Sequence, residues 1–163
     1  MSMLLVVGDA PSQALRAQAQ TRESIQAAAD AGGIGAHLRF LGTITDYAEL
    51  GHLYRMADVH VFPVRQIAGD PEGFGMVAVE AAAHGLPTVA FATGGVVDAV
   101  ADGRSGHLVP IGDYATFARA VISILAEAAA MRESSTAFAR QFAWPEFGHR
   151  IAKELRTVFD APR

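Results

Sequence analysis

Short apolar runs alternate with longer stretches of helical periodicity along most of this chain. Runs rich in Val, Leu and Phe that end in turn residues are typical of buried strands, whereas apolar positions three and four apart indicate helices. The pattern predicts strands over residues 4–7, 36–41, 58–62, 88–91 and 107–109. It predicts helices over residues 12–31, 46–56, 73–84, 96–101, 113–130, 133–142 and 145–159.

Capping residues support the ends of several of these helices. Asp46 is the expected N-cap of the second helix, with Glu49 three residues later in a capping-box pattern, and Asp113 is the expected N-cap of the helix from residue 113. Gly32–Gly33 and Gly85 follow the last apolar positions of their helices, where glycine is the usual C-terminal stop.

The alternation of strands and helices favours an α/β fold, a Rossmann-like parallel sheet with helices on both faces. Such sheets bind ligands beyond the carboxyl ends of their strands, so the loops after Val7, Leu41, Phe62 and Phe91 form the expected functional edge. A chain of 163 residues fits a single domain over residues 1–163, with C-terminal helices over about 131–159.

Composition excludes several classes of protein. Hydrophobic residues make up 51% and charged residues 18% of the chain, which is typical of a globular protein. The net charge is −4 and Lys153 is the one lysine, so nucleic-acid binding is not expected. The chain has no cysteine, and its six histidines lack metal-binding spacing. We therefore expect no metal or cofactor and a cytoplasmic location.

The segment from Glu72 to Glu80, with the sequence EGFGMVAVE, carries the most chemical information. It places two carboxylates eight positions apart, beside a Gly-rich turn that follows a strand and opens a helix. Free N–H groups at a helix N-terminus bind anions, and eight helical residues rise about 12 Å, roughly the reach from the sugar to the ribose of a nucleotide sugar. With this spacing, one carboxylate could bind the sugar hydroxyls and the other the ribose hydroxyls of such a ligand, while the diphosphate lies between them on the N–H groups.

The motif resembles the E-x7-E signature of the large retaining nucleotide-sugar glycosyltransferase family that includes glycogen synthases and sucrose-phosphate synthases. Further segments resemble that family in the expected order, at residues 4–11, 39–42, 57–63, 85–89, 94–95 and 102–109. The match is to the C-terminal, donor-binding half of a two-domain enzyme with the GT-B fold. It implies a glycosyltransferase, that is, a hexosyltransferase in the full-length parent.

The resemblance assigns roles to the residues of the motif. Glu72 is the candidate catalytic residue, accepting hydrogen bonds from donor-sugar hydroxyls, and Glu80 is the candidate for the ribose hydroxyls. The turn and the start of the helix are expected to meet the diphosphate or sugar through their backbone; these donor-binding candidates are Gly73, Phe74, Gly75 and Met76. The structural alternatives are that Glu72 interacts only with the helix dipole and that Glu80 is exposed to solvent. Phe74 and Met76 would then be core residues, and the glycines would form a plain turn.

Two other loops are donor-binding candidates. Gly94 and Gly95 follow a strand and precede a short helix, where the resemblance implies a contact with the donor sugar or phosphate. Gly42, Thr43 and Ile44 follow another strand at the functional edge and correspond to the segment that frames the nucleobase. Both are equally explained as turns. The family usually carries Glu a few positions after the glycine pair, and this chain has Val97-Asp98 instead.

The chain departs from the family pattern at its N-terminal end. The family's donor half normally opens with one more strand and helix, which carry an Arg and a Lys for the donor phosphates. We therefore expect a truncated domain that lacks this first βα unit and the N-terminal acceptor domain, and that is inactive alone. The strand from Leu4 then pairs directly with the one from Asp58, or a second copy fills the gap in a strand-exchanged homodimer.

The sequence thus predicts the donor-binding half of a retaining glycosyltransferase that moves a hexose from a nucleoside diphosphate sugar. The parent is expected to be cytoplasmic or peripheral at a membrane. The main alternative is a non-catalytic nucleotide-binding α/β module, and other GT-B reactions, such as epimerisation or phosphorolysis, are a second alternative. The pattern does not identify the nucleobase, the sugar or the acceptor.

Overall fold

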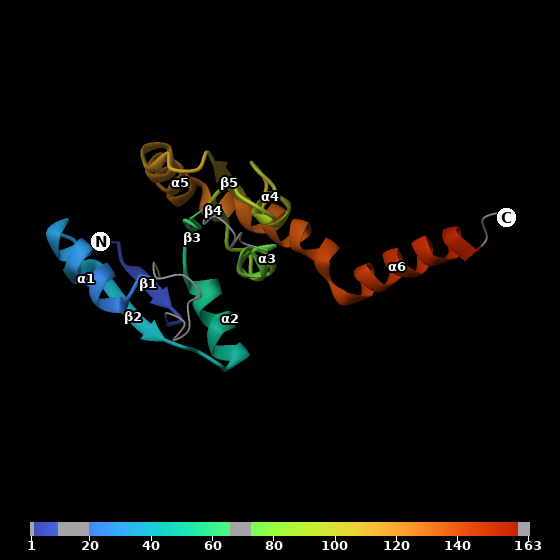
Figure 1. Ribbon diagram of the computed structural model, residues 1–163, viewed down its shortest axis with the longest axis horizontal. Coiled ribbons are helices and arrows are strands. Elements are labelled where there is room, and N and C mark those ends of the chain that lie inside the picture. Colours follow the sequence, from blue (N-terminus) through green and yellow to red (C-terminus); the bar gives the residue numbers. More distant parts are fainter. Residues whose placement is uncertain (1, 10–19, 66–72, 160–163) are drawn as a thin grey trace. The chain divides into compact units, whose positions relative to one another are not determined.

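The computed structural model describes residues 2–9, 20–65 and 73–159. These residues form two compact units, one over Met1–Leu50 and the other over Gly51–Arg163, and each unit contains a sheet of its own (Figure 1). The single domain expected over residues 1–163 stays a prediction.

Among the described residues, the first unit contains a two-stranded parallel sheet, one α-helix and the start of a second. Strand β1 (Leu4–Val7) pairs with β2 (Leu38–Gly42), and Leu4 lies opposite Leu38. Helix α1 (Arg22–Ala31) precedes a short 3-10 turn, η1 (Gly35–His37). Residues 10–19 lie outside the described residues, and the predicted helix is wrong at positions 20 and 21. The physical reason is capping: Thr21 has extended backbone and its side chain accepts the N–H of Ser24.

Helix α2 (Tyr47–Met56) begins in the first unit and continues into the second. Asp46 caps it as predicted, because its carboxylate accepts the N–H of Ala48 at 2.7 Å and that of Glu49 at 3.3 Å. The strand predicted from residue 58 begins at His60, two positions later.

The second unit is built on a three-stranded parallel sheet. Strands β3 (His60–Phe62), β4 (Thr88–Phe91) and β5 (Gly106–Val109) lie in the order β3-β4-β5. All four residues of β4 are buried, as expected for the central strand of a sheet covered on both faces. The parallel sheet with helices on both faces confirms the predicted α/β, Rossmann-like class.

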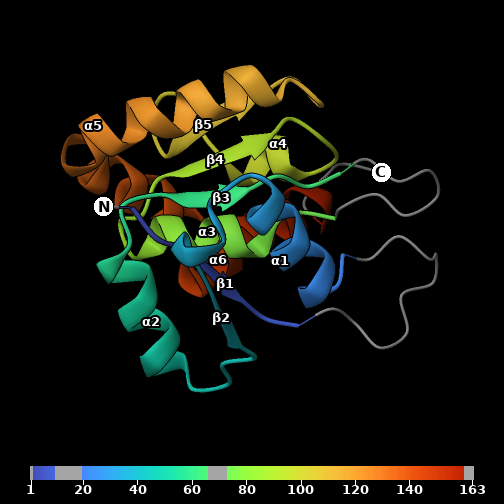
Figure 2. The ribbon, with the colours of Figure 1, turned by 90° about the vertical axis from the view of Figure 1, so that its left-hand side faces the viewer.

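Alternate residues of β4 face two different hydrophobic cores. On one face Ala90 packs with small side chains of α3 (Met76–Ala83) and α4 (Val96–Ala99). On the other face Val89 and Phe91 pack with α5 (Tyr114–Ala139) through Phe117, Ile124 and Met131. Figure 2 shows α3 and α5 on opposite sides of this sheet. The far end of α5 joins the first core through Phe138 and Ala139.

Helix α3 begins three residues later than predicted, at Met76 instead of residue 73. Its N-cap, Gly75, has a φ of +78°, a left-handed conformation that no helical residue adopts. The helix ends at Ala83, one residue before the predicted end, and Gly85 follows as the predicted stop with a φ of +75°. The late start leaves Gly73 and Phe74 in the loop, and Gly75 caps the helix by accepting the N–H of Ala78 at 2.9 Å.

Helix α5 is continuous over 26 residues, so the predicted break between residues 130 and 133 is wrong. The residues at this point, Met131 and Arg132, are good helix formers, and Met131 is buried in the core. Asp113 caps the helix as predicted by accepting the N–H of Thr116 at 2.9 Å. By length and composition, Tyr114–Phe142 is the one stretch of the described residues that could cross a membrane.

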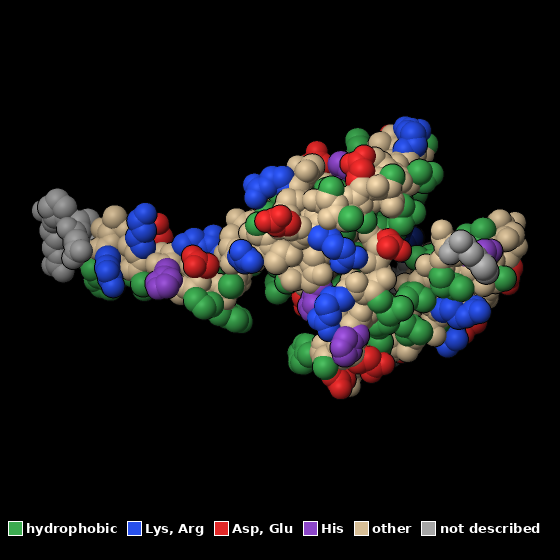
Figure 3. Space-filling model, turned by 180° about the vertical axis from the view of Figure 1, so that it is seen from behind, with side chains coloured by type: hydrophobic (Ala, Val, Ile, Leu, Met, Phe, Trp, Pro, Cys, Tyr) green, Lys and Arg blue, Asp and Glu red, His purple; other side chains and the backbone are tan. Residues whose placement is uncertain are grey.

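The chain continues through a 3-10 turn, η2 (Arg140–Phe142), into α6 (Trp144–Phe159). The predicted C-terminal helices are thus confirmed, apart from the break before residue 133. The residues of α6 whose burial the structure describes are all exposed. Figure 3 shows apolar side chains along one side of this helix, at the left of the view. They are Trp144, Phe147, Ile151, Leu155 and Phe159.

The strand from Leu4 lies in the first unit and the strand of residues 58–62 in the second, so their direct pairing stays a prediction. Strand β1 pairs with β2 in the first unit, and β3 pairs with β4 in the second. Within its own unit, the other edge of β1 and that of β3 have no strand partner among the described residues.

Candidate functional site

The loop before α3 brings most of the predicted residues together in the second unit. Glu72, the candidate catalytic residue, lies outside the described residues. Gly75 is packed so tightly that a Cβ there would lie 3.2 Å from the ring of Phe62 and 3.5 Å from a methyl group of Val96. Its left-handed backbone and these close neighbours both require glycine at this position.

A backbone hydrogen bond joins this loop to the glycine pair that follows β4. The N–H of Gly95 donates to the carbonyl oxygen of Gly73 at 2.9 Å. A Cβ on Gly95 would overlap that oxygen and lie 2.9 Å from the Cα of Phe74. Gly94 has a φ of +50°, so the turn itself also favours glycine. The sequence placed both loops at one edge of the sheet, and the structure shows that they touch.

The two larger side chains of the loop region have different surroundings. Phe74 is partly buried, and its ring lies edge-on to Phe142 at a centroid distance of 5.4 Å, so its side chain is part of the core. Met76 is 60% exposed at the first position of α3. The first N–H groups of a helix have no carbonyl acceptor within it, and here they lie directly after Gly75.

Glu80 lies one helical turn beyond Met76 on α3 and is partly buried. Its carboxylate accepts a hydrogen bond of 3.2 Å from the hydroxyl of Tyr54 on α2. The solvent-exposed Glu80 that the sequence left as an alternative is therefore wrong, and nothing in the sequence indicated a contact with Tyr54. Burial raises the pKa of Tyr54 to about 12, with contributions from the charge of Glu80 and from their hydrogen bond.

Two histidines lie beside Tyr54. The ring of His84 stacks on that of Tyr54 at 5.3 Å, and its Nδ1 lies 2.8 Å from the carbonyl oxygen of Glu80. The ring of His60 is edge-on to Tyr54 at 6.4 Å, and its Nδ1 lies 3.1 Å from Oγ1 of Thr88. Burial lowers the pKa of His60 to about 4, so this imidazole is neutral near pH 7.

The predicted nucleobase segment belongs to the first unit. Gly42 has a φ of +69°, and its carbonyl oxygen accepts the N–H of Gly8 at 2.8 Å. The hydroxyl of Thr43 donates to Asp9 at 3.2 Å, and Ile44 is partly buried. These contacts join the turn after β1 to the turn after β2, the two loops at the carboxyl ends of this sheet.

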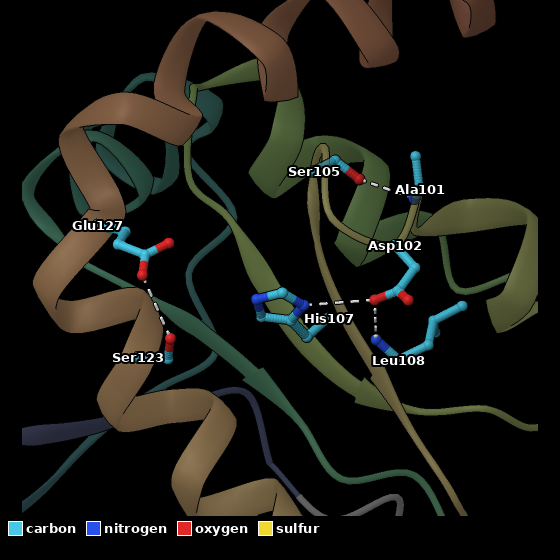
Figure 4. Close-up of polar contacts among 7 residues, drawn as sticks. All are labelled: Ala101, Asp102, Ser105, His107, Leu108, Ser123 and Glu127. Carbon is cyan, nitrogen blue, oxygen red and sulfur yellow. Dashed lines mark hydrogen bonds and ion pairs between the residues drawn. The ribbon is translucent and has the colours of Figure 1, made fainter.

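A second polar cluster lies at the start of β5 (Figure 4). Asp102 accepts the N–H of Leu108 at 3.1 Å and lies 3.3 Å from Nδ1 of His107. The hydroxyl of Ser105 accepts the N–H of Ala101 at 2.9 Å. These bonds close the turn that leads into the strand, which gives the cluster a structural role. Within the described residues, no group of three His, Asp or Glu side chains is arranged to hold a metal ion.

The second unit therefore combines two features at one end of α3. Backbone N–H groups of a glycine-rich loop and a helix N-terminus are suited to an anion such as a phosphate. A partly buried carboxylate one turn along the helix is suited to accept hydrogen bonds from hydroxyl groups. Together they suit a ligand that carries phosphate and hydroxyl groups about a helical turn apart.

The chain is similar to known proteins of one family. The model of the family described as "Glycosyl transferases group 1" matches residues 2–142. The chain is 35% identical, over 158 residues, to a phosphatidyl-myo-inositol mannosyltransferase of Mycobacterium leprae. It is 41% identical, over 117 residues, to a D-inositol 3-phosphate glycosyltransferase of Mycolicibacterium smegmatis. These matches cover 95% and 71% of this chain, but 38% and 26% of the relatives.

Solved structures resemble the chain over almost its whole length. The sucrose-phosphate synthase of Thermosynechococcus elongatus matches with a TM-score of 0.77 and 30% identity, covering 98% of this chain and 39% of the synthase. The Anabaena protein HepE, solved in complex with UDP, matches with a TM-score of 0.75 and 25% identity, covering 96% of this chain and 41% of HepE. The chain therefore spans about two fifths of the length of these proteins.

Proposed function

The chain belongs to the group 1 glycosyltransferases and has the C-terminal fold of their GT-B architecture, and on this premise we propose that it is the donor-binding half of a retaining glycosyltransferase. In this proposal, the enzyme moves a hexose from a nucleoside diphosphate sugar to an acceptor held by an N-terminal domain. The observation that carries the proposal is the hydrogen bond from Gly95 to Gly73, which joins two glycine turns at the start of the helix that bears Glu80.

The proposal assigns each part of the donor to a group of residues. The diphosphate lies on the backbone of Gly73, Phe74, Gly75 and Met76 and of the Gly94–Gly95 turn. The donor-sugar hydroxyls bind Glu72, and the ribose hydroxyls bind Glu80. That Gly42, Thr43 and Ile44 of the first unit frame the nucleobase stays a separate prediction. HepE, whose structures contain UDP and UDP-glucose, supports a donor of this class.

The proposed reaction is a front-face substitution. The bond from the anomeric carbon to the diphosphate breaks while the acceptor oxygen forms a bond to the same face of that carbon. The acceptor proton passes to the departing phosphate oxygen, so no protein nucleophile takes part. The protein contributes by positioning the reactants and by stabilising the negative charge that develops on the diphosphate. The proposal requires no metal or cofactor, and transfer should continue in EDTA.

The alternative is a nucleotide-binding module without catalysis. It shares the fold and the phosphate loop but has no need of a carboxylate at position 72. In an enzyme that contains both domains, Glu72→Gln should strongly reduce transfer if Glu72 holds the donor sugar, while binding of the free nucleotide should remain. An unchanged transfer rate would contradict the assigned role of Glu72.

Calorimetric titration of the chain with UDP, GDP and ADP tests donor binding directly. We expect one diphosphate to bind, Glu80→Ala to weaken that binding, and Glu133→Ala, on α5, to leave it unchanged. UDP is the first to test because HepE was solved with it. The same titration on a chain extended by the family's N-terminal strand and helix completes the test, and failure of both proteins to bind any of the three would overturn the proposal.

The proposal also concerns partners and location. An N-terminal acceptor domain supplies the rest of the enzyme, and the protein is proposed to be cytoplasmic, with the parent able to associate peripherally with a membrane. A second copy of the chain is a further proposed partner, because β1 and β3 each have an edge without a strand partner among the described residues. Light scattering after gel filtration tests the strand-exchanged homodimer, and a single monomeric peak would contradict it.

A further inference from the structure

Behind Glu80 lies a set of aromatic side chains that the proposed function does not use. Tyr54 comes from α2, His60 from β3 and His84 from the end of α3. All three belong to the second unit. The rings of both histidines contact the ring of Tyr54, and the Tyr54 hydroxyl donates to the Glu80 carboxylate at 3.2 Å.

We propose that Tyr54 is a positioning residue for Glu80: its hydroxyl holds the carboxylate in the orientation that receives the ribose hydroxyls of the donor. This inference rests on the proposed function, because it deepens the role of Glu80 in the same site. It adds a residue from α2, which lies outside the E-x7-E segment.

The ring of Tyr54 is held on two sides, which fixes where its hydroxyl lies. His84 stacks on it with an interplanar angle of 24° at 5.3 Å, and His60 meets it edge-on at 87° and 6.4 Å. A tyrosine side chain has only two rotatable torsions before the rigid ring, so contacts on the ring also determine the position of the oxygen. The donor to Glu80 is therefore preorganised.

His84 is itself held by both helices. Its Nδ1 lies 2.8 Å from the carbonyl oxygen of Glu80, one turn earlier on α3. On the α2 side its ring lies against Gly51, where a Cβ would be 3.0 Å from Nε2 of the imidazole. The absence of a side chain at Gly51 lets α2 approach closely, and this approach places Tyr54, three residues later, opposite Glu80.

The hydrogen bond leaves the carboxylate with capacity for a ligand. A carboxylate has about four acceptor sites on its two oxygens, and Tyr54 occupies one of them, on Oε2. Within residues 2–9, 20–65 and 73–159, Oε1 makes no hydrogen bond. A carboxylate fixed through one oxygen can present the other to two neighbouring hydroxyl groups without first losing rotational freedom.

A purely structural role for the pair is the competing explanation, because a partly buried carboxylate needs a hydrogen-bond partner even where no ligand binds. The two explanations differ in what they predict for the ribose. A structural contact supports the whole site, so losing it should weaken every ligand equally. A positioning contact should matter only for ligands that carry ribose hydroxyls.

The test compares Tyr54→Phe with Tyr47→Phe, a control on the same helix whose side chain is 89% exposed. Each variant is titrated with the diphosphate that the unmodified chain binds and with its dideoxy analogue, which lacks both ribose hydroxyls. We expect Tyr54→Phe to weaken the ribonucleotide about tenfold, as for the loss of a hydrogen bond to a charged group, and to leave the analogue unchanged. The proposal would be overturned if Tyr54→Phe weakened the binding of both ligands equally, or if it weakened the binding of neither.

A measurement without ligand separates this inference from the proposed function. Tyr54 is the partly buried tyrosine of the three in the chain, and burial raises its pKa to about 12. In an ultraviolet titration, Glu80→Gln should bring that ionisation to lower pH, because it removes the negative charge that opposes it. If Tyr54 ionised at the same pH in Glu80→Gln and in the unmodified chain, the contact between Tyr54 and Glu80 would be contradicted. If Glu80→Gln lowers the pH at which Tyr54 ionises but the chain binds no nucleotide, the proposed function is overturned and the ribose role of Glu80 with it.

Discussion

Gly95 and Gly73 are joined by a backbone hydrogen bond of 2.9 Å, although 21 residues lie between them. The bond connects the loop after β4 to the loop before α3, and there is no room for a side chain at Gly95. The proposed phosphate-binding surface therefore consists of two turns that are held together by a hydrogen bond and close backbone packing.

This contact predicts that Gly95→Ala destabilises the protein. The methyl group would meet backbone atoms of Gly73 and Phe74, so the two loops must separate, at a cost of about 1–3 kcal/mol, the usual range for overpacking. Urea denaturation followed by circular dichroism measures the change. Gly73→Ala is the matched control because a Cβ there meets nothing within 4 Å, and its effect should stay within about 0.5 kcal/mol. Equal losses for both variants would contradict the packing described.

A second prediction concerns acid and His60. Burial lowers the pKa of His60 to about 4 in the folded protein, below the 6.5 of an exposed imidazole. The unfolded chain then binds more protons than the folded one between these values, so stability falls as the pH is lowered from about 6.5 to 4. The loss is at most about 3 kcal/mol.

The measurement for His60 is the free energy of unfolding at a series of pH values, with His60→Gln for comparison. The variant should lose less stability across this window, because its side chain does not titrate. His52, which is exposed on α2, supplies the control substitution His52→Gln, which should keep the pH dependence of the unmodified chain. A pH dependence that is the same in all three proteins would show that His60 is not the group responsible.

A third prediction tests whether α5 is a core helix. Ile124 is 1% exposed against β4 and β5, whereas Ile122 on the same helix is 67% exposed. Ile124→Ala should cost about 2–5 kcal/mol through lost burial and the cavity left behind, and Ile122→Ala should change stability by no more than about 0.5 kcal/mol. Chemical denaturation in the absence of detergent gives both values. If Ile122→Ala were the more harmful change, the buried face of α5 would be wrongly assigned.

A fourth prediction concerns the cap of α5. Hydrogen bonds from the hydroxyl and the N–H of Thr116 hold the pKa of Asp113 below its usual value. A depressed carboxyl pKa stabilises the folded state above the unfolded pKa of about 4, and this contribution is lost as the pH falls through it. The difference in melting temperature between the unmodified chain and Asp113→Asn should be largest near neutral pH and should shrink as the pH falls below about 4. A difference that does not change between pH 7 and acid pH would contradict this origin.

The features that local chemistry determines were predictable from the sequence. Asp46 and Asp113 cap their helices because a carboxylate accepts N–H groups two or three residues later, and Gly85 ends α3 because it tolerates a left-handed conformation. The parallel α/β fold was predictable for a similar reason. The apolar periods that distinguish strands from helices can be read from short segments of sequence.

The features that depend on distant residues were not predictable. Tyr54 and Glu80 are 26 positions apart, and nothing in either segment indicates that α2 and α3 approach at Gly51. The glycines at 73 and 95 were recognised as turn residues. Their contact depends on the positions of the loops after β3 and β4 in the folded sheet, which the local sequence does not determine. The predicted break in α5 failed because the alanine-rich stretch before Met131 carries no stop signal and the core favours a continuous helix.

The two close approaches at this site differ in how the protein could adapt to change. The neighbours of Gly51 are the ends of the His84 and Arg55 side chains, so a larger residue at 51 could be accommodated by a second substitution that shortens either one. The neighbours of Gly95 are backbone atoms, which no substitution elsewhere can trim. Position 51 is therefore open to paired change, whereas position 95 has no compensating partner, and an evolutionary path that alters it must rebuild the loop itself.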